Sequence, residues 1–268
     1  MKRTDLAMEI HGLLSAEESA SSLPGVRAET KQRGSIRTTV VQVLDEQGAR
    51  RMGKARGTYL SMELQDTDAQ TRAEAAAQLA GHLGKLLPAR GAVTVVGLGN
   101  RAVTADALGA RSVDRLLITA HLAGQFPRLR SVSAFCPGVK GRTGLESLEL
   151  VRAVTARAGS ACVIAVDALA AAELSHIGTV IQLSDAGIQP GSGVGNRRDG
   201  LDRKSLGVPV LALGVPTVTD PDESGLGRAV TTADIDASVA SMACLLADAL
   251  NRALQPGLSQ RELEDFVR

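Results

Sequence analysis

The stretch Ala92–Ala110, AVTVVGLGNRAVTADALGA, decides the fold class that we predict for this chain of 268 residues. It begins with a nearly unbroken apolar run that ends at Leu98, as is typical of a parallel strand covered on both faces. Gly97 and Gly99 then allow a tight turn, and a loop leads to Asp106. In an open α/β sheet, ligands bind beyond the carboxyl ends of the strands. Asp106 therefore lies where a functional residue is expected.

The rest of the chain alternates between strand-like and helix-like segments. Further strands are expected at 130–137, 161–166, 179–183 and 208–215, and helices at 66–87, 112–122, 145–158, 168–177 and 232–254. Two β-branched segments, 36–44 and 57–64, are expected to add a strand pair at one edge, whereas residues 1–35 are expected to form a polar, loosely packed lead-in. The pattern predicts a doubly wound, mostly parallel α/β sheet with helices on both faces.

Composition argues against several classes of function. The net charge is +1 and aromatic residues make up 1% of the chain, so neither a basic surface nor stacking platforms for direct nucleic-acid binding are expected. The three cysteines include no CxxC pair, which is typical of reduced thiols in a cytoplasmic protein. The N-terminus has no apolar core of a signal peptide, and no run of about 18 apolar residues predicts a membrane span.

Three aspartates follow predicted strands and form the strongest constellation for chemistry. If the strands are parallel, Asp106, Asp167 and Asp185 lie along one edge of the sheet. A single such residue is as readily explained by helix capping, but three favour a shared site. Two nearby carboxylates can share a proton, so that one acts as a base and the other as an acid.

Other motifs leave alternatives open. Gly97-x-Gly99-x-x-Ala102 resembles a dinucleotide-binding fingerprint, but the helix is expected to start too late, so a tight turn is the favoured interpretation. The Gly-rich segment Pro190–Asn196 lacks the Lys-Ser/Thr of a P-loop and is expected to be a mobile or substrate-binding loop. A carboxylate site for a divalent ion also stays open, although no HExxH or close ligand pair supports it.

A set of longer motifs resembles one known family. They are RTDLAMEI (3–10), MGKARGTYLSMEL (52–64), VVGLGNRAVTADALG (95–109), VSAFCPGVKGRTGLES (132–147), VIAVDALAA (163–171) and IQLSDAGIQPGSGVGNRR (181–198). In this order they resemble the germination proteases of bacterial spores, endopeptidases that degrade small acid-soluble spore proteins. The resemblance implies a fold similar to that of hydrogenase maturation proteases, an aspartic-type mechanism without a cofactor or metal, a homotetramer, and a location in the cytoplasm of the forespore and spore core.

The resemblance also implies roles for individual residues. Asp106 and Asp167 match the family's catalytic pair, with Asp185 as a supporting residue. The family's substrates are cut after an acidic residue, in a pattern of Thr-Glu, apolar, Ala, Ser/Thr, Glu. Residues 4–9, TDLAME, resemble this pattern, so a zymogen is expected to cut itself between Asp5 and Leu6. Residues 1–5 would then be a short pro-segment, and 6–268 a single peptidase domain.

Three departures from the family pattern make an inactive homologue an alternative. Arg101, Ala105 and Gln189 replace a Trp, a Pro and a His that are usual in the family. A catalytic or metal-binding role for that His therefore does not carry over to this chain. The alternatives to the aspartic mechanism are a metal-dependent peptidase and an inactive homologue that acts as a binding protein.

Overall fold

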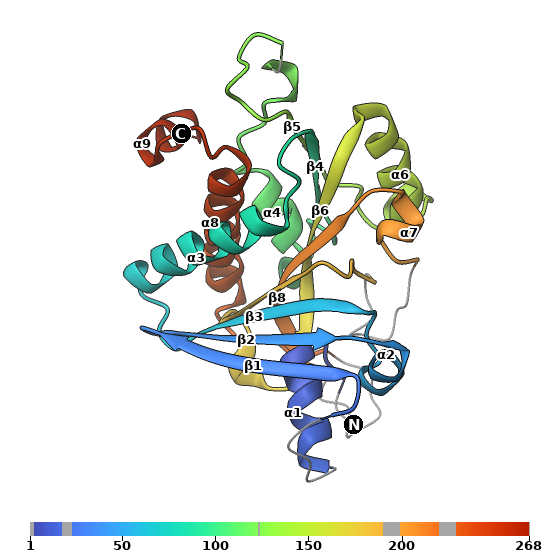
Figure 1. Cartoon of the computed structure of the whole chain (residues 1–268). Helices are drawn as coiled ribbons and strands as arrows, with labels where there is room; N and C mark the ends of the chain where they lie inside the picture. The colour runs from blue at the N-terminus through green and yellow to red at the C-terminus, as the bar shows by residue number, and fades with distance from the viewer. Residues whose placement is uncertain (1–2, 18–22, 123, 190–198, 220–228, 268) are drawn as a thin grey trace.

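The strands of the molecule join in a single mixed sheet. The computed structural model describes residues 3–17, 23–122, 124–189, 199–219 and 229–267. Within these residues the sheet has eight strands in the order β1-β2-β3-β7-β8-β6-β4-β5 (Figure 1). Their bounds are β1 Val26–Arg33, β2 Ile36–Val43, β3 Gly57–Leu64, β4 Ala92–Gly97, β5 Val132–Phe135, β6 Ser160–Ala171, β7 Val180–Ser184 and β8 Val210–Thr219.

Helices cover both faces of the parallel half of the sheet, which consists of β8, β6, β4 and β5. α3 (Ala69–Leu86), α4 (Leu108–Val113) and α8 (Ile235–Leu254) enclose the largest apolar cluster on one face. α6 (Ser147–Ala158) and α7 (Arg203–Leu206) cover the other face, as Figure 1 shows. This arrangement confirms the predicted α/β fold with helices on both faces.

The antiparallel half of the sheet is larger than the predicted strand pair. β2 and β3 lie where that pair was expected, but β1 precedes them and β7 joins β3 to β8, each pairing being antiparallel. β1 is an edge strand with side chains exposed along nearly its whole length, which is why its sequence reads as polar. The expected loop between β2 and β3 contains α2 (Glu46–Met52), which Asp45 caps.

The expectation of a loosely packed lead-in is wrong. α1 (Ala7–Glu17) packs against β2 and β3, and Ala7 and Ile10 are buried in a cluster with Val41 and Tyr59. Polar residues separate the short apolar stretches of this segment, so its composition alone does not reveal a buried face. The helix is stabilised by packing against its neighbours in the tertiary structure. The first residues of the chain are thus held against the body of the sheet.

The helix predicted over 168–177 is also wrong. β6 continues through Asp167 to Ala171 and is followed by the short 3-10 helix η3 (Leu174–His176). Ala168–Ala171 pair with β8 and are largely buried, so tertiary pairing overrides the helix propensity of alanine. Asp167 therefore lies inside a strand instead of ending it. The helix expected over 112–122 begins earlier, as α4, and ends at Val113.

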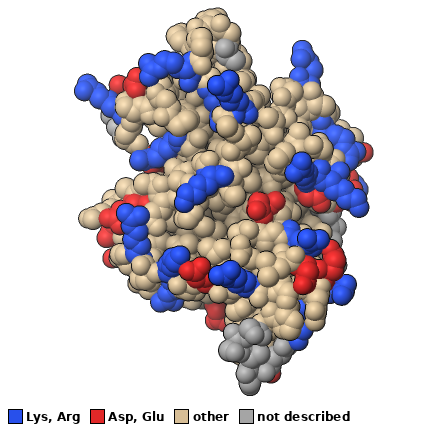
Figure 2. Space-filling view, in the orientation of Figure 1, with Lys and Arg blue, Asp and Glu red and all other residues tan. Residues whose placement is uncertain are grey.

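The remaining helices have three to eight residues each. They are α5 (Lys140–Thr143), α9 (Gln260–Val267) and the 3-10 helices η1 (Thr104–Asp106) and η2 (Ala120–Leu122). Figure 2 shows Lys and Arg side chains scattered singly or in small groups among Asp and Glu on the face drawn. In the part of the chain that the structure describes, no helix has the length and apolar character needed to cross a bilayer.

Candidate active site

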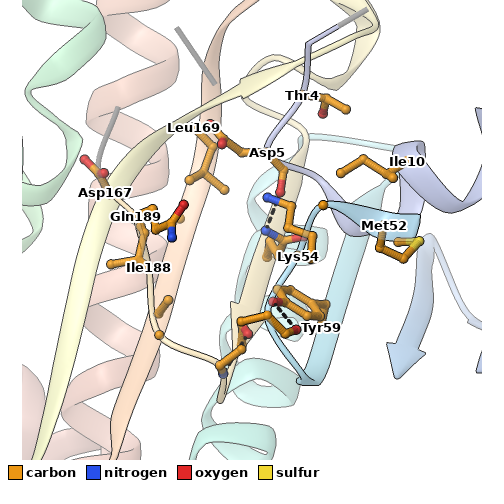
Figure 3. Close-up of a pocket in the computed structure, with 18 of the residues that line it drawn as sticks. Thr4, Asp5, Ile10, Met52, Lys54, Tyr59, Asp167, Leu169, Ile188 and Gln189 are labelled. Carbon is orange, nitrogen blue, oxygen red and sulfur yellow. Dashed lines mark hydrogen bonds between the residues drawn. The ribbon is translucent and has the colours of Figure 1, made fainter. Parts of the chain in front are cut away.

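A pocket of about 370 Å³ lies where the two halves of the sheet meet the N-terminal segment (Figure 3). Its walls come from residues 3–5, the segment between α2 and β3, and strands β6, β7 and β8. Its polar lining includes Thr4, Asp5, Lys54, Tyr59, Asp167 and Gln182. It therefore combines converging polar groups with apolar side chains such as Ile10, Met52 and Leu169, as small-molecule and peptide sites do.

Asp167 and Gln182 face this pocket from the same row of the sheet. Asp167 of β6 and Gln182 of β7 both pair with Gly214 of β8, one from each side. Directly paired residues point to the same face, and the Leu169 side chain lies over Gly214, 2.7 Å from where a Cβ of residue 214 would stand. The two side chains are only 5% and 8% exposed. Burying polar groups is costly unless they are hydrogen-bonded. Two buried polar side chains that face a pocket therefore make this row a candidate for function.

Asp106 lies on a neighbouring segment but outside the lining of the pocket. It ends η1, and its carboxylate accepts a hydrogen bond from the backbone N–H of Asn100 at 2.7 Å. Gly99 has a φ of +92°, and a Cβ there would stand 2.1 Å from the carbonyl oxygen of Asp106. Thr217 of β8 donates to the carbonyl of Ala105 at 2.6 Å. The glycine turn and β8 therefore hold the Asp106 loop in place.

β4 and β6 are adjacent parallel strands, so the segments that carry Asp106 and Asp167 are neighbours. Gly97 pairs with Val166, and the N–H of Leu98 donates to the carbonyl of Val166 at 2.8 Å. The structure thus brings the two segments to one region of the sheet, but only Asp167 lines the pocket. Their joint catalytic role stays a prediction.

Asp185 does not share the edge on which Asp106 and Asp167 were expected to meet it. β7 runs antiparallel to β8, so its carboxyl end points the opposite way. The Asp185 side chain is exposed there and accepts a hydrogen bond from the N–H of Thr58 at 2.7 Å. The assumption of parallel strands is therefore wrong for this residue. A supporting role for Asp185 stays a prediction.

The bond predicted for self-cleavage lies at this pocket. The N–H of Asp5 donates to the carbonyl of Ala170 at 2.8 Å, so the segment adds to β6 by backbone pairing. Leu6 is 0% exposed. It belongs to an apolar cluster with Leu169, Ala171 and Val180.

Lys54 and Tyr59 bring further titratable groups to the pocket. Burial lowers the pKa of the Lys54 ammonium, and the nearby charge of Asp5 opposes that change. Figure 3 shows the Lys54 side chain beside Asp5, whereas Asp167 lies across the pocket from both. Burial raises the pKa of Tyr59, whose hydroxyl donates to the carbonyl of Ala55 at 2.8 Å. Tyr59 is therefore a neutral donor at any physiological pH.

The Glu9 carboxylate is buried beside the pocket and fully engaged. It accepts hydrogen bonds from the N–H groups of Ala172 at 2.8 Å and Glu173 at 3.1 Å, and from the Thr4 hydroxyl. His176 Nδ1 lies 2.6 Å from Oε1, the same oxygen that accepts from the N–H of Glu173. Burial works against ionisation of Glu9, but these partners outweigh it and lower the pKa of Glu9. The hydrogen bond to Glu9 raises the pKa of His176, and the two form an ion pair whenever His176 is protonated.

The sequence analysis missed three of these residues. Lys54, Gln182 and His176 come from different segments, and no spacing in the chain relates them. Glu9 entered only as the last residue of the TDLAME pattern, without a partner. Lys54 and Gln182 do lie within two of the family motifs, MGKARG and IQLSD, which is the signal that could have singled them out. Gln189, at the position of the family's His, lines the pocket with an exposed side chain.

The described residues do not form the geometry that the nucleotide-binding and metal-dependent alternatives require. α4 begins at Leu108, well past the glycines, and Asp114 forms an ion pair with Arg101 at 2.5 Å. The dinucleotide geometry, with a helix N-terminus at the glycine turn, is therefore not formed. Among the residues that the structure describes, no group of three or more His, Cys, Asp and Glu is arranged to hold a metal ion. The loop Pro190–Asn196 lies outside those residues.

Comparison with known proteins finds one family throughout. Residues 3–225 match a family model described as germination protease. A germination protease of Caldanaerobacter subterraneus subsp. tengcongensis is 36% identical over 99% of this chain and 98% of its own length. That of Clostridium tetani is 41% identical over 81% of this chain and 70% of its own.

Other matches are more partial. The germination protease of Bacillus subtilis is 41% identical over 81% of this chain, and the match spans 63% of that longer protein. Among solved structures, the [NiFe] hydrogenase maturation protease HycI of Thermococcus kodakarensis KOD1 is similar over 63% of this chain and 98% of its own, with 18% identity and a TM-score of 0.39.

Proposed function

This chain belongs to the germination protease family, and on that premise we propose that it is an aspartic-type endopeptidase that starts the degradation of small acid-soluble spore proteins. The family supports a protease role in spore germination. The observation that carries the finer proposal is the pocket, because both Asp167 and Asp5, the residue before the predicted cleavage bond, line it. An acidic side chain and a peptide segment share one site.

The proposed chemistry is hydrolysis of an amide by water. One carboxylate removes a proton as the water oxygen bonds to the carbonyl carbon, and the other donates a proton to the nitrogen as the C–N bond breaks. Asp167 is assigned to the pocket side of this pair because it lines the cavity, and Asp106 is its proposed partner from the adjacent loop. The products are a carboxylate and an amine.

Self-processing of a zymogen is the second part of the proposal. Residues 3–5 line the pocket, so a substrate protein and this segment would compete for the same space. Cleavage after Asp5 would release residues 1–5 as the short pro-segment and leave a peptidase domain of residues 6–268. We further propose that the protein is a homotetramer of the spore cytoplasm, in keeping with the family.

Incubation of the purified full-length chain with a purified small acid-soluble spore protein, followed by mass spectrometry, tests this function. The expected result is one early cut in the spore protein after an acidic residue, together with loss of residues 1–5 from the enzyme. A parallel incubation with a chelator is expected to give the same products. Activity that chelation removes and one divalent ion restores would replace the aspartic mechanism with a metal-dependent one. An intact spore protein would identify an inactive homologue that only binds.

A further inference from the structure

The Gln182 carboxamide bonds the backbone of Asp5 and of Ala7, and so brackets Leu6 and the Asp5–Leu6 bond. Its Nε2 donates to the carbonyl oxygen of Asp5 at 3.0 Å, and its Oε1 accepts from the N–H of Ala7 at 2.8 Å. The N–H of Leu6 donates to the Thr4 hydroxyl at 3.0 Å. Each polar group of the backbone around this bond is therefore engaged. A single side chain holds the carbonyl that hydrolysis would attack.

Two acidic side chains of the same segment are also held by specific donors. The Asp5 carboxylate accepts from the N–H of Ala170 at 2.9 Å and lies beside the Lys54 ammonium (Figure 3). Four residues beyond the bond, Glu9 is held by two backbone N–H groups and by His176. A buried carboxylate is costly unless it is paired, so both places select for a negative charge.

We propose that Gln182, Lys54 and His176 are the residues that bind a peptide substrate across the cleaved bond, and that residues 4–9 lie in the substrate groove as a substrate would. The inference rests on the proposed function. Lys54 binds the acidic side chain of the residue immediately before the bond, at the position of Asp5. His176 binds the acidic side chain of the fourth residue after the bond, at the position of Glu9. Gln182 holds the peptide between them.

The row of the sheet gives Gln182 its place in the reaction. Asp167 and Gln182 flank Gly214 on the same face, so a peptide held by Gln182 lies over the row that carries Asp167. As the water oxygen bonds to the carbonyl carbon of residue 5, negative charge gathers on the carbonyl oxygen. The N–H of Gln182 is already directed at that oxygen, and a preorganised donor of this kind stabilises the developing charge.

A merely structural anchor for α1 would need none of this arrangement at the bond. It would require the buried Glu9 and Leu6, but not a carboxamide on both sides of one peptide group, nor an ammonium beside Asp5. Anchoring and substrate reading therefore differ in what they predict for cleavage. If these residues only anchor α1, their substitution changes stability alone. If they bind the substrate, substitutions of two contacting residues have non-additive effects on the cleavage rate.

The test is a pair of double-mutant cycles on self-cleavage of the full-length chain, timed by mass spectrometry. One cycle combines Asp5→Asn with Lys54→Met, and the other combines Glu9→Gln with His176→Gln. Each single variant is expected to slow cleavage about tenfold, and each double variant is expected to be no slower than its slower parent. Lys85→Met, at an exposed lysine of α3, is the matched control. It should leave the self-cleavage rate unchanged, both alone and in combination with Asp5→Asn.

The same proteins are then given a synthetic peptide of residues 1–14 with Asp5→Asn or Glu9→Gln made in the peptide alone, because this change cannot unfold the enzyme. Wild type should cut both altered peptides about tenfold more slowly than the native one. Lys54→Met should lose only the preference at position 5, and His176→Gln only that at position 9. Gln182→Leu should slow cleavage of every peptide about 100-fold while the protein melts cooperatively.

The outcomes separate the two levels of the proposal. Cleavage at Asp5–Leu6 with additive effects in both cycles, or with a preference that no variant removes, would overturn the assigned subsites and leave the peptidase intact. Cleavage of the peptide but not of the chain would remove self-processing and still decide the subsites. If neither the chain nor the peptide nor a spore protein is cut, the proposed function fails and the subsites fail with it.

Discussion

Asp167 and Gln182 lie in one row of the sheet, each paired with Gly214 from opposite sides of β8. The absence of a side chain at Gly214 lets the Leu169 side chain lie 2.7 Å from where a Cβ of residue 214 would stand. A buried carboxylate and a buried carboxamide thus face the same pocket at which the Asp5–Leu6 bond lies. This relationship joins the parallel and antiparallel halves of the sheet in one site and is the basis of the predictions below.

Replacing either proposed catalytic carboxylate should stop hydrolysis without unfolding the protein. Asp167→Asn and Asp106→Asn keep shape but cannot act as base or acid, so we expect each to slow cleavage of a spore protein by about 100- to 10,000-fold. Asp265→Asn is the matched control, because Asp265 is exposed on α9 and does not line the pocket. Full activity in Asp106→Asn would leave this residue only the role of holding the Asn100 turn.

Gly214→Ala should crowd the row that carries Asp167 and Gln182. A Cβ at Gly214 would stand 2.7 Å from the Leu169 side chain and 2.8 Å from the carbonyl oxygen of Asp167. We expect a loss of about 1–3 kcal/mol of unfolding free energy, measured by denaturant titration, because the buried neighbours must shift. Gly81→Ala in α3 meets nothing within 4 Å and should instead stabilise by about 0.5–1 kcal/mol. Equal effects of the two substitutions would contradict the packing argument.

Gly99→Ala should displace the loop that carries Asp106. The left-handed φ and the 2.1 Å approach of a Cβ to Asp106 add steric conflict to backbone strain. Gly144→Ala isolates the strain alone, since Gly144 has a φ of +76° but open space around it, and should cost about 1 kcal/mol. The thermal unfolding temperature should therefore fall further for Gly99→Ala than for Gly144→Ala. The cleavage rate of Gly99→Ala should fall as well. A variant that is destabilised yet fully active would separate the turn from catalysis.

The docking of α1 should depend on pH through Glu9 and His176. His176 has a pKa raised above its ordinary 6.5, by the hydrogen bond to Glu9 and by the charges of Glu9, Glu63 and Glu173, so its contribution is complete below pH 6.5 and is lost as pH rises through the folded-state pKa. Glu9 has a pKa lowered below 4.5, so its contribution is present above pH 4.5 and is lost as pH falls through the folded-state pKa.

The stability difference between wild type and His176→Gln should therefore be largest between pH 4.5 and 6.5. We expect about 1–3 kcal/mol there, as for a hydrogen bond to a charged group, and a smaller difference at pH 8. Denaturant titrations of both proteins across this range provide the measurement. A difference that stays constant with pH would show that the pair contributes by packing instead of by charge.

Local patterns were enough to predict most of the sheet. The apolar runs at β4, β6 and β8 and the Pro88-terminated helix α3 carry their own periodicity and boundaries, and each formed close to its expected place. The errors came where neighbours decide the outcome. β1 reads as a polar arm because an edge strand buries little, and Ala168–Ala171 favour a helix until β8 provides a partner.

The sequence by itself determined the family, the α/β class and the two aspartates to be tested. Long motifs and the apolar runs of buried strands are continuous in the sequence and can be recognised there directly. Only the tertiary structure decided which residues face one another. The antiparallel direction of β7 turns Asp185 away and carries Gln182 into the row of Asp167, while backbone pairing with β6 brings Asp5 beside Lys54. Such contacts depend on strand direction and register, which no spacing along the chain encodes.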